Sequence, residues 1–128
     1  MLNESVLEIV SVGFITREVF EHGLAELTAR CAENPKLHAL MWTTTDLEGY
    51  EPGNTAQAMK WVGRHPQIRR AAVVTRSQVL ASLTHIGRVL IPGLETRSFR
   101  LRAEALEWFT TPLTGRPRTR SSNRHKAA

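Results

Sequence analysis

The sequence predicts an α/β domain with a mostly parallel sheet of four or more strands, flanked by helices. Short apolar or β-branched runs alternate with segments of helical periodicity, in the order βαβαβαβα. Such alternation favours parallel strands joined by right-handed crossovers. The chain has 128 residues, 41% of them hydrophobic, which is enough to bury one core without disulfide bonds or a metal ion. We expect one domain over residues 1–111 and a basic tail over residues 112–128.

The first strand and the first helix have clear patterns. Residues 5–12 (SVLEIVSV) alternate and are rich in β-branched side chains, which predicts a strand. Residues 16–34 follow helical spacing, with Thr16 as a suitable N-cap, and the Asn34-Pro35 pair ends the helix. The buried side of this helix is predicted to consist of Val19, Phe20, Leu24, Leu27 and Cys31.

A second strand and a second helix enclose a polar segment. Residues 36–43 (KLHALMWT) are nearly all apolar, as expected of a strand that is buried on both faces. The polar segment, residues 43–54, precedes a short helix over about residues 55–64, which ends before Pro66.

The remaining elements complete the alternation. Residues 68–75 (IRRAAVVT) predict a third strand, and residues 77–91 a third helix with Ser77 as N-cap. Residues 94–101 (LETRSFRL) predict a strand at the sheet edge, and residues 103–109 a short closing helix. The buried side of the third helix is predicted to be Val79, Leu80, Leu83, Ile86 and Leu90.

The positive charge of the chain is concentrated in the tail. Five of the 17 basic residues, and none of the 12 acidic ones, lie beyond Thr111, so the first 111 residues are neutral overall. The pI near 10.3 therefore does not indicate a basic folded face. The tail can contact polyanions weakly through flexible arginines, but a solubilising terminus is the interpretation we favour, because no aromatic residue accompanies the charge.

The composition favours a cytoplasmic protein. The single cysteine, Cys31, has no intrachain partner for a disulfide bond. The first ten residues carry acids where a signal peptide needs basic residues. No apolar run approaches the roughly 20 residues that a membrane span requires.

Several segments resemble the SpoIIAA-like group of small bacterial proteins, which is related in fold to STAS domains and to the CRAL-TRIO lipid-binding domains. The resemblance spans about residues 6–109 and is carried by VGFITREVF, DLEGYEPG, RRAAVVT and TRSFRLRAEALEWF. Its most specific parts are the Glu48-Gly49 pair and RAEALEW with the preceding Arg97-Ser98-Phe99. It implies a non-enzymatic regulatory or protein-interaction module with a protein partner.

The related families imply two further possibilities. Anti-sigma factor antagonists of this fold are switched by phosphorylation of a serine that begins the helix after the central strand. The nearest residue here is Thr55, without the Asp-Ser-Ser-Gly-like motif, and an ordinary helix-capping role is the more common explanation. Lipid-binding relatives imply a carrier or sensor of a small hydrophobic ligand, held between the sheet and the second or third helix.

We predict the partner surface at the carboxyl ends of the strands, because ligands gather there in open parallel sheets. Helix capping and loop hydrogen bonds are the competing explanation for these polar side chains. The loop after the second strand is the expected docking loop, in which Tyr50 either anchors a partner or folds back on the core. The candidate residues are Thr43, Thr44, Thr45, Asp46, Glu48, Tyr50, Thr75, Arg76 and Ser77.

No pattern indicates catalysis, so we expect no enzyme activity, no cofactor and no metal. The five histidines lack metal-ligand spacing, and no serine lies in a nucleophile-elbow motif. Cys31 falls on an apolar helix stripe, where a buried structural thiol is the common case. Trp42, Trp61 and Trp108 could line a ligand cavity, but core packing is the ordinary role of such residues.

Overall fold

Four parallel strands form the main sheet, in the spatial order β1-β3-β5-β6. The computed structural model describes residues 5–113, except for the side chains at positions 83, 88 and 89. The predicted parallel sheet with flanking helices is confirmed, and β6 lies at an edge, as expected. The predicted tail lies outside the described residues from position 114 onwards. The strands of this sheet are β1 (Val6–Val10), β3 (Ala39–Thr43), β5 (Arg70–Val74) and β6 (Glu95–Phe99).

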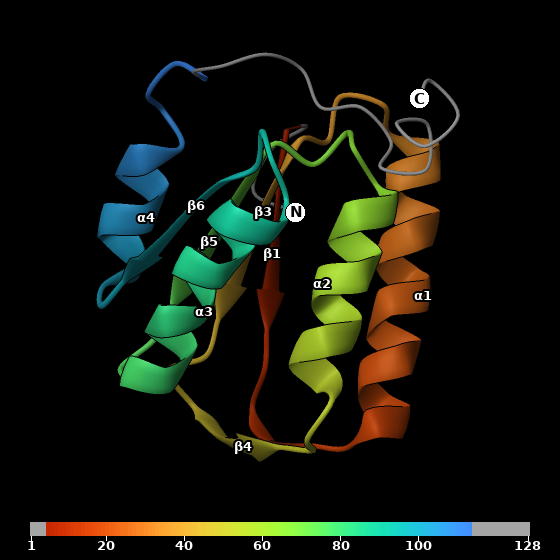
Figure 1. Ribbon diagram of the computed structural model, residues 1–128, viewed down its shortest axis with the longest axis vertical. Coiled ribbons are helices and arrows are strands. Elements are labelled where there is room, and N and C mark those ends of the chain that lie inside the picture. Colours follow the sequence, from red (N-terminus) through yellow and green to blue (C-terminus); the bar gives the residue numbers. More distant parts are fainter. Residues whose placement is uncertain (1–4, 114–128) are drawn as a thin grey trace.

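Helices cover both faces of the main sheet, in a three-to-one division (Figure 1). On one face, Leu7 and Leu40 of the strands pack with Trp61 and Cys31. On the other face, Met41 and Val74 pack with α4. The two clusters explain why β3 is apolar almost throughout, since both of its faces are covered. The helices are α1 (Arg17–Glu33), α2 (Asn54–Arg64) and α3 (Gln78–Leu90) on the first face, and α4 (Arg102–Trp108) on the second.

A second, two-stranded parallel sheet was not predicted from the sequence. It pairs β2 (Gly13–Ile15) with β4 (Leu47–Tyr50). The supposed polar loop over residues 43–54 therefore contains a strand. Gly13 has a φ of 73°, which glycine adopts without strain, and the register shifts between Gly13 and Phe14. Runs of three and four residues are too short for alternation to be recognised.

The cap predictions for α1 and α3 are confirmed, and the prediction for α2 is wrong. Thr16 Oγ1 accepts a hydrogen bond from the Val19 amide at 3.2 Å, and Ser77 Oγ accepts one from the Leu80 amide at 3.3 Å. At α2 the cap position is Gly53, with a φ of 96°, and no side chain caps the helix. Thr55, for which a capping role was expected, is the second helical residue rather than the cap.

The predicted buried side of α3 is largely wrong. Leu80 is buried, but Val79, Ile86 and Leu90 are exposed at 67%, 46% and 64%; the side chain at position 83 is outside the described part. The helix instead meets β6 through Thr84 and Gly87. A Cβ atom on Gly87 would lie 3.5 Å from Thr96 Cγ2, and Thr96 Oγ1 donates to the Thr84 carbonyl at 2.5 Å.

Thr84 and Gly87 thus form the contact of α3 with β6 next to the buried Leu80, while Val79, Ile86 and Leu90 lie on a more exposed side of the helix. A hydrophobicity pattern favours the bulky stripe and therefore misplaces the contact. On α1 the buried side is correct for Cys31, but Val19 is 56% exposed.

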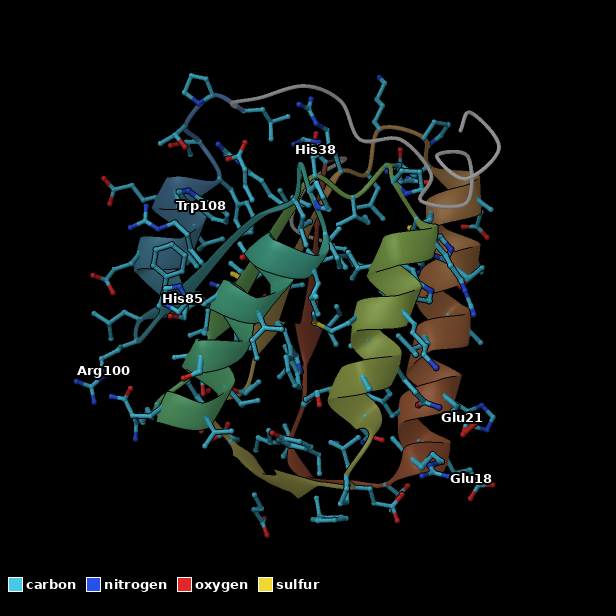
Figure 2. The ribbon with its side chains drawn as sticks, in the orientation of Figure 1. Glu18, Glu21, His38, His85, Arg100 and Trp108 are labelled. Carbon is cyan, nitrogen blue, oxygen red and sulfur yellow. The ribbon has the colours of Figure 1, made fainter. Side chains whose placement is uncertain are left out.

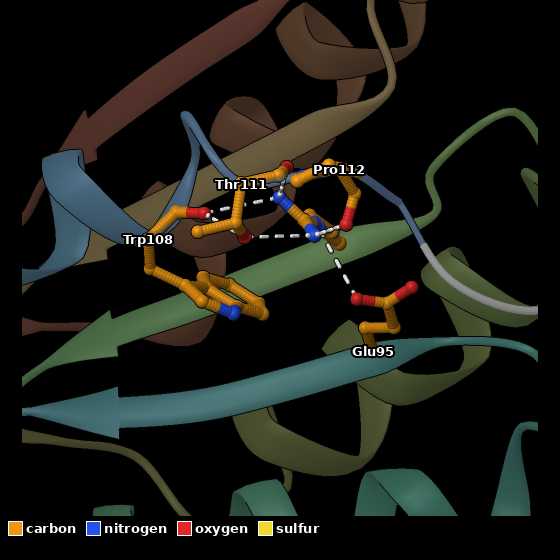
Figure 3. A network of polar contacts seen from close by, with 5 residues as sticks. Glu95, Trp108, Thr111 and Pro112 are labelled. Atoms are coloured by element: carbon orange, nitrogen blue, oxygen red, sulfur yellow. Dashed lines mark hydrogen bonds and ion pairs between the residues drawn. The ribbon is translucent and has the colours of Figure 1, made fainter.

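A buried arginine fastens α4 to the sheet (Figure 3). Arg70 is 2% exposed and forms an ion pair with Glu95 at 3.2 Å. Its guanidinium also donates to the carbonyls of Trp108, Thr111 and Pro112 at 3.1, 2.8 and 2.6 Å. These carbonyls lie at and just beyond the end of α4, where helix carbonyls lack partners within the helix. Arg70 therefore donates hydrogen bonds to the carbonyls at the end of α4 and also neutralises the charge of Glu95.

Candidate functional site

An apolar groove of about 530 Å³ lies between the main sheet and helices α1, α2 and α3. Ile9, Trp42 and Val73 form part of its floor, and Met59 of α2 and Ile91 after α3 contribute to its walls. In Figure 1, α2 and α3 stand apart in front of the sheet, and residues of both helices line the groove. The groove is open enough to admit a small apolar ligand.

One end of the groove is polar. It lies near the carboxyl end of the sheet, where Ser11, Asn54 and Thr55 are among the lining residues. Trp42 Nε1 donates to Ser11 Oγ at 2.8 Å. Asn54 is 3% exposed, and its side-chain amide donates to the Ile15 carbonyl at 3.2 Å, which joins the start of α2 to β2.

The predicted partner residues from two strands do meet at this carboxyl edge. The Thr44 amide donates to the Val74 carbonyl at 2.9 Å, and Thr44 Oγ1 donates to the same carbonyl at 2.8 Å. Thr75 Oγ1 accepts a hydrogen bond from the Ser77 amide at 3.0 Å. Thr43, Thr44 and Thr75 are all buried, so their hydroxyl groups serve the internal structure of this edge.

The other predicted partner residues differ in accessibility. Tyr50 is half-buried in β4, at the end of the smaller sheet, and Ser77 is exposed although its hydroxyl caps α3. The remaining predicted residues have exposed side chains that could meet a partner. These are Thr45, Asp46, Glu48 and Arg76.

A polar cluster that the sequence did not predict joins β1 to α4. Glu8 accepts hydrogen bonds from Arg102 Nε and Nη2 at 2.9 and 2.8 Å, and from Thr43 Oγ1 at 2.6 Å. The hydrogen bond from Arg102 is the main cause that lowers the pKa of the Glu8 carboxyl group, and Thr43 assists, whereas burial opposes the shift. A lone glutamate in an alternating strand gives no sequence signal of such a partner.

The free energy of unfolding should therefore decrease at acidic pH. Because the folded-state pKa of Glu8 is lowered, its contribution is complete above the ordinary glutamate pKa and is lost as the pH falls through the folded-state value. Glu8→Gln should flatten the acid limb of a plot of unfolding free energy against pH, measured by urea denaturation. Glu104→Gln, at an exposed position of α4, is the control and should leave the limb unchanged. Identical limbs for Glu8→Gln and the wild type would contradict the assignment.

The other titratable and aromatic residues have structural roles. Burial raises the pKa of the Cys31 thiol, which makes the thiolate scarce. His65 stacks on Trp61 with ring centroids 4.0 Å apart. His38 and His85 lie on separate parts of the fold (Figure 2). Within residues 5–113, no group of three or more His, Cys, Asp or Glu side chains is placed to hold a metal ion.

The tryptophans divide between the core and the groove. Trp108 packs against Phe99 and Phe109, with ring centroids 5.7 and 5.2 Å away. Trp61 is buried and donates to Thr28 Oγ1 at 2.9 Å, and it lines the groove together with Trp42. Both alternatives drawn from the sequence, core packing and cavity lining, therefore apply to part of the trio.

Comparison with known proteins agrees with this architecture. A crystal structure of an uncharacterised DUF3478-family protein with a SpoIIAA-like fold, from Shewanella loihica PV-4, is 22% identical, with a TM-score of 0.64 over 80% of this chain and 82% of that one. The unphosphorylated anti-sigma factor antagonist SpoIIAA is 12% identical, with a TM-score of 0.64 over 88% and 96% of the two chains. At these identities, the similarity shows a shared fold.

Three further findings concern the sequence and its helices. No curated protein matches it in sequence. None of the helices in the described part is both long and apolar enough to cross a membrane. The SpoIIAA-like family model matches residues 6–110, which are nearly all of the described residues, and the chain therefore belongs to the SpoIIAA-like family.

Proposed function

We propose that this protein is a cytoplasmic, non-enzymatic carrier or sensor of a small hydrophobic ligand. The groove carries the proposal. Its volume of about 530 Å³ falls in the range of roughly 300–1,000 Å³ that is typical of small-molecule sites. Apolar side chains form most of its lining, with a few polar groups at one end, which is the usual composition of such sites.

The packing of the protein supports this proposal. Protein interiors are close-packed and contain few voids larger than a water molecule. A groove floored by Ile9, Trp42 and Val73 keeps apolar surface in contact with water, and an apolar ligand would remove that surface from water. The core cluster on the same sheet face also contains Cys31, Leu37 and Ile68, which are buried and do not line the groove, so the opening is local.

Native mass spectrometry of the purified protein, beside its denatured intact mass, tests the proposal. A bound molecule that is lost on denaturation is the expected result. Titration with decanoate should also change the tryptophan emission in a saturable way, because Trp42 and Trp61 line the groove. A clean native mass together with an unchanged emission would contradict the carrier function.

Docking of a protein partner is the second candidate function, favoured by an exposed aromatic ring on β2. Phe14 is 58% exposed and pairs with Gly49 of β4. Its ring lies so close to the backbone there that a Cβ atom on Gly49 would be 3.1 Å from Phe14 Cδ2. Asp46 and Glu48 are exposed around it. An exposed aromatic with a charged rim is the anatomy of many interfaces.

Substitution of this ring should separate docking from ordinary surface exposure. The Phe14→Ser variant should no longer recover the partner from cell extract, because a large anchor side chain is lost. Val10→Ser is the matched control, since Val10 is 59% exposed, and it should retain the partner. Equal recovery by the two variants would contradict docking at β2 and β4.

Phosphorylation of Thr55 is a regulatory proposal for the same region. Thr55 is the second residue of α2 and is partly exposed, and the absence of a side-chain cap favours an anion at this helix start. Intact mass spectrometry of the protein from its native host should reveal one phosphoryl group. A wholly unmodified chain would contradict the switch.

A further inference from the structure

We infer that the groove takes a chain that ends in a carboxylate, and that Ser11, oriented by Trp42, selects this head group. The inference rests on the proposed function. It adds the chemical class of the ligand and names a specificity-determining side chain.

The hydroxyl group of Ser11 is held as a donor. Ser11 lies just after β1, where its amide donates to the Thr43 carbonyl at 3.0 Å. Its Oγ accepts the indole N–H of Trp42 at 2.8 Å, so one lone pair is occupied. The hydroxyl proton has no acceptor among residues 5–113, and both side chains line the groove. A hydroxyl that accepts one hydrogen bond becomes a better donor for the next.

The neighbouring polar groups are also donors. The Thr55 hydroxyl lines the same groove and makes no hydrogen bond within the part of the chain that the structure describes. The first turn of α2 has no side-chain cap, so its amides and the helix dipole favour an acceptor. Asn54 Oδ1 is an unpartnered acceptor among the described residues, but it is shielded from solvent. A ligand therefore meets donors at this end.

The charges around the groove do not oppose a carboxylate. Two acidic residues contribute to the lining, and both are paired: Glu8 with Arg102 at 2.8 Å and Glu26 with Arg30 at 3.4 Å. Near the start of α2, the guanidinium of Arg17 would lie 3.8 Å from a Cβ atom on Gly53. The carboxylate of Glu51, in turn, accepts the backbone amide of Arg17.

Donors at one end and an apolar floor together define the ligand class. A carboxylate accepts several hydrogen bonds, and those to a charged acceptor are the stronger ones. An alcohol of the same length is less strongly hydrated, so apolar burial alone would favour the alcohol. An alkylammonium brings only donors, so it could use the remaining lone pairs of the two hydroxyl groups but would leave the Ser11 hydroxyl proton without an acceptor. The expected order of affinity is therefore carboxylate, alcohol, ammonium, which apolar burial alone does not produce.

Calorimetric titration of the full chain with decanoate, decanol and decylammonium at neutral pH tests the order. We expect decanoate to bind about tenfold more tightly than decanol, which corresponds to one additional charge-assisted hydrogen bond. Ser11→Ala should reduce this ratio to near one. Ser82→Ala is the matched control, because Ser82 is exposed on α3 and bonds the Gln78 carbonyl; it should keep the ratio.

A second variant tests whether the indole of Trp42 orients the Ser11 hydroxyl group. Trp42→Phe keeps Ser11 but removes the indole donor, so it should lower the ratio of decanoate affinity to decanol affinity. Tightest binding of decanol by the wild type, or an undiminished preference in both Ser11→Ala and Trp42→Phe, would overturn the inference while the carrier function stands. Failure of all three compounds to bind the wild type would overturn the carrier function as well.

Discussion

Arg70→Met should destabilise the protein by about 3 kcal/mol, because removal of one member of a buried ion pair leaves its partner groups unsatisfied. Arg70 is 2% exposed, and its guanidinium donates to Glu95 and to three carbonyls around the end of α4. Methionine retains the apolar stem and removes every donor. The carbonyl of Trp108 would lose its bond to Arg70, and the end of α4 should loosen from Met41, Ala72 and Val74.

Urea denaturation gives the change in the free energy of unfolding. Arg100→Met is the control, since Arg100 is exposed and its side chain points away from the fold in Figure 2; a change within about 0.5 kcal/mol is expected. Arg70→Lys should recover only part of the loss, because an ammonium cannot reproduce the planar fork of donors. Arg70 also lies 4.9 Å from the Trp108 ring centroid, so the emission of this tryptophan should shift. Equal stability of Arg70→Met and Arg100→Met would refute the proposed role of Arg70 in holding α4 against the sheet.

The main sheet was predictable because its signal is local. Each of β1, β3 and β5 is a short run of apolar or β-branched residues between helical patterns, which is the pattern that specifies a parallel sheet. The caps at Thr16 and Ser77 were also predictable, since a cap depends on residues three positions apart. By contrast, β2 and β4 are only three and four residues long, which is too short for a local pattern to reveal a strand.

The roles of Arg70 and of the α3 contact depend on distant partners. A charged residue in a strand normally indicates an exposed position, yet Arg70 is buried because α4 brings carbonyls to it. Thr84 and Gly87 face the sheet because β6 presents Thr96 there. The carboxyl-edge residues were correctly gathered from strand order, but which of their hydroxyl groups are buried depends on the exact register of β3 and β5.

The sequence favours core packing over a cavity for Trp42, Trp61 and Trp108, since large aromatic residues are ordinarily buried in the core. The volume of the groove depends on how far α2 stands from α3. Each helix is positioned by its own contacts: α2 through the Trp61–Thr28 hydrogen bond to α1, and α3 through Thr84 and Thr96 to β6. No amphipathic pattern within one helix encodes the distance between two. A substitution that fills the space between α2 and α3 can therefore test whether this space is open.

Ala58→Phe should fill the groove and abolish decanoate binding. Ala58 lies on α2 and lines the groove, so a phenylalanine there can bury its ring between the sheet and α3 without displacing packed atoms. Ala56→Phe is the matched control, because Ala56 is exposed on the same helix and its substitution has the same cost in helix propensity. Burial of the ring should make Ala58→Phe more stable than the control by about 1.5–3 kcal/mol.

Thermal and urea denaturation measure this difference, and calorimetry with decanoate measures binding. If the groove is open space, the ring enters it, stability rises relative to Ala56→Phe, and the ligand is excluded. If packed side chains occupied that space, the same ring would overpack the core and cost about 1–3 kcal/mol. The sign of the difference between two variants of one helix thus decides whether α2 and α3 enclose a binding site, independently of which ligand is offered.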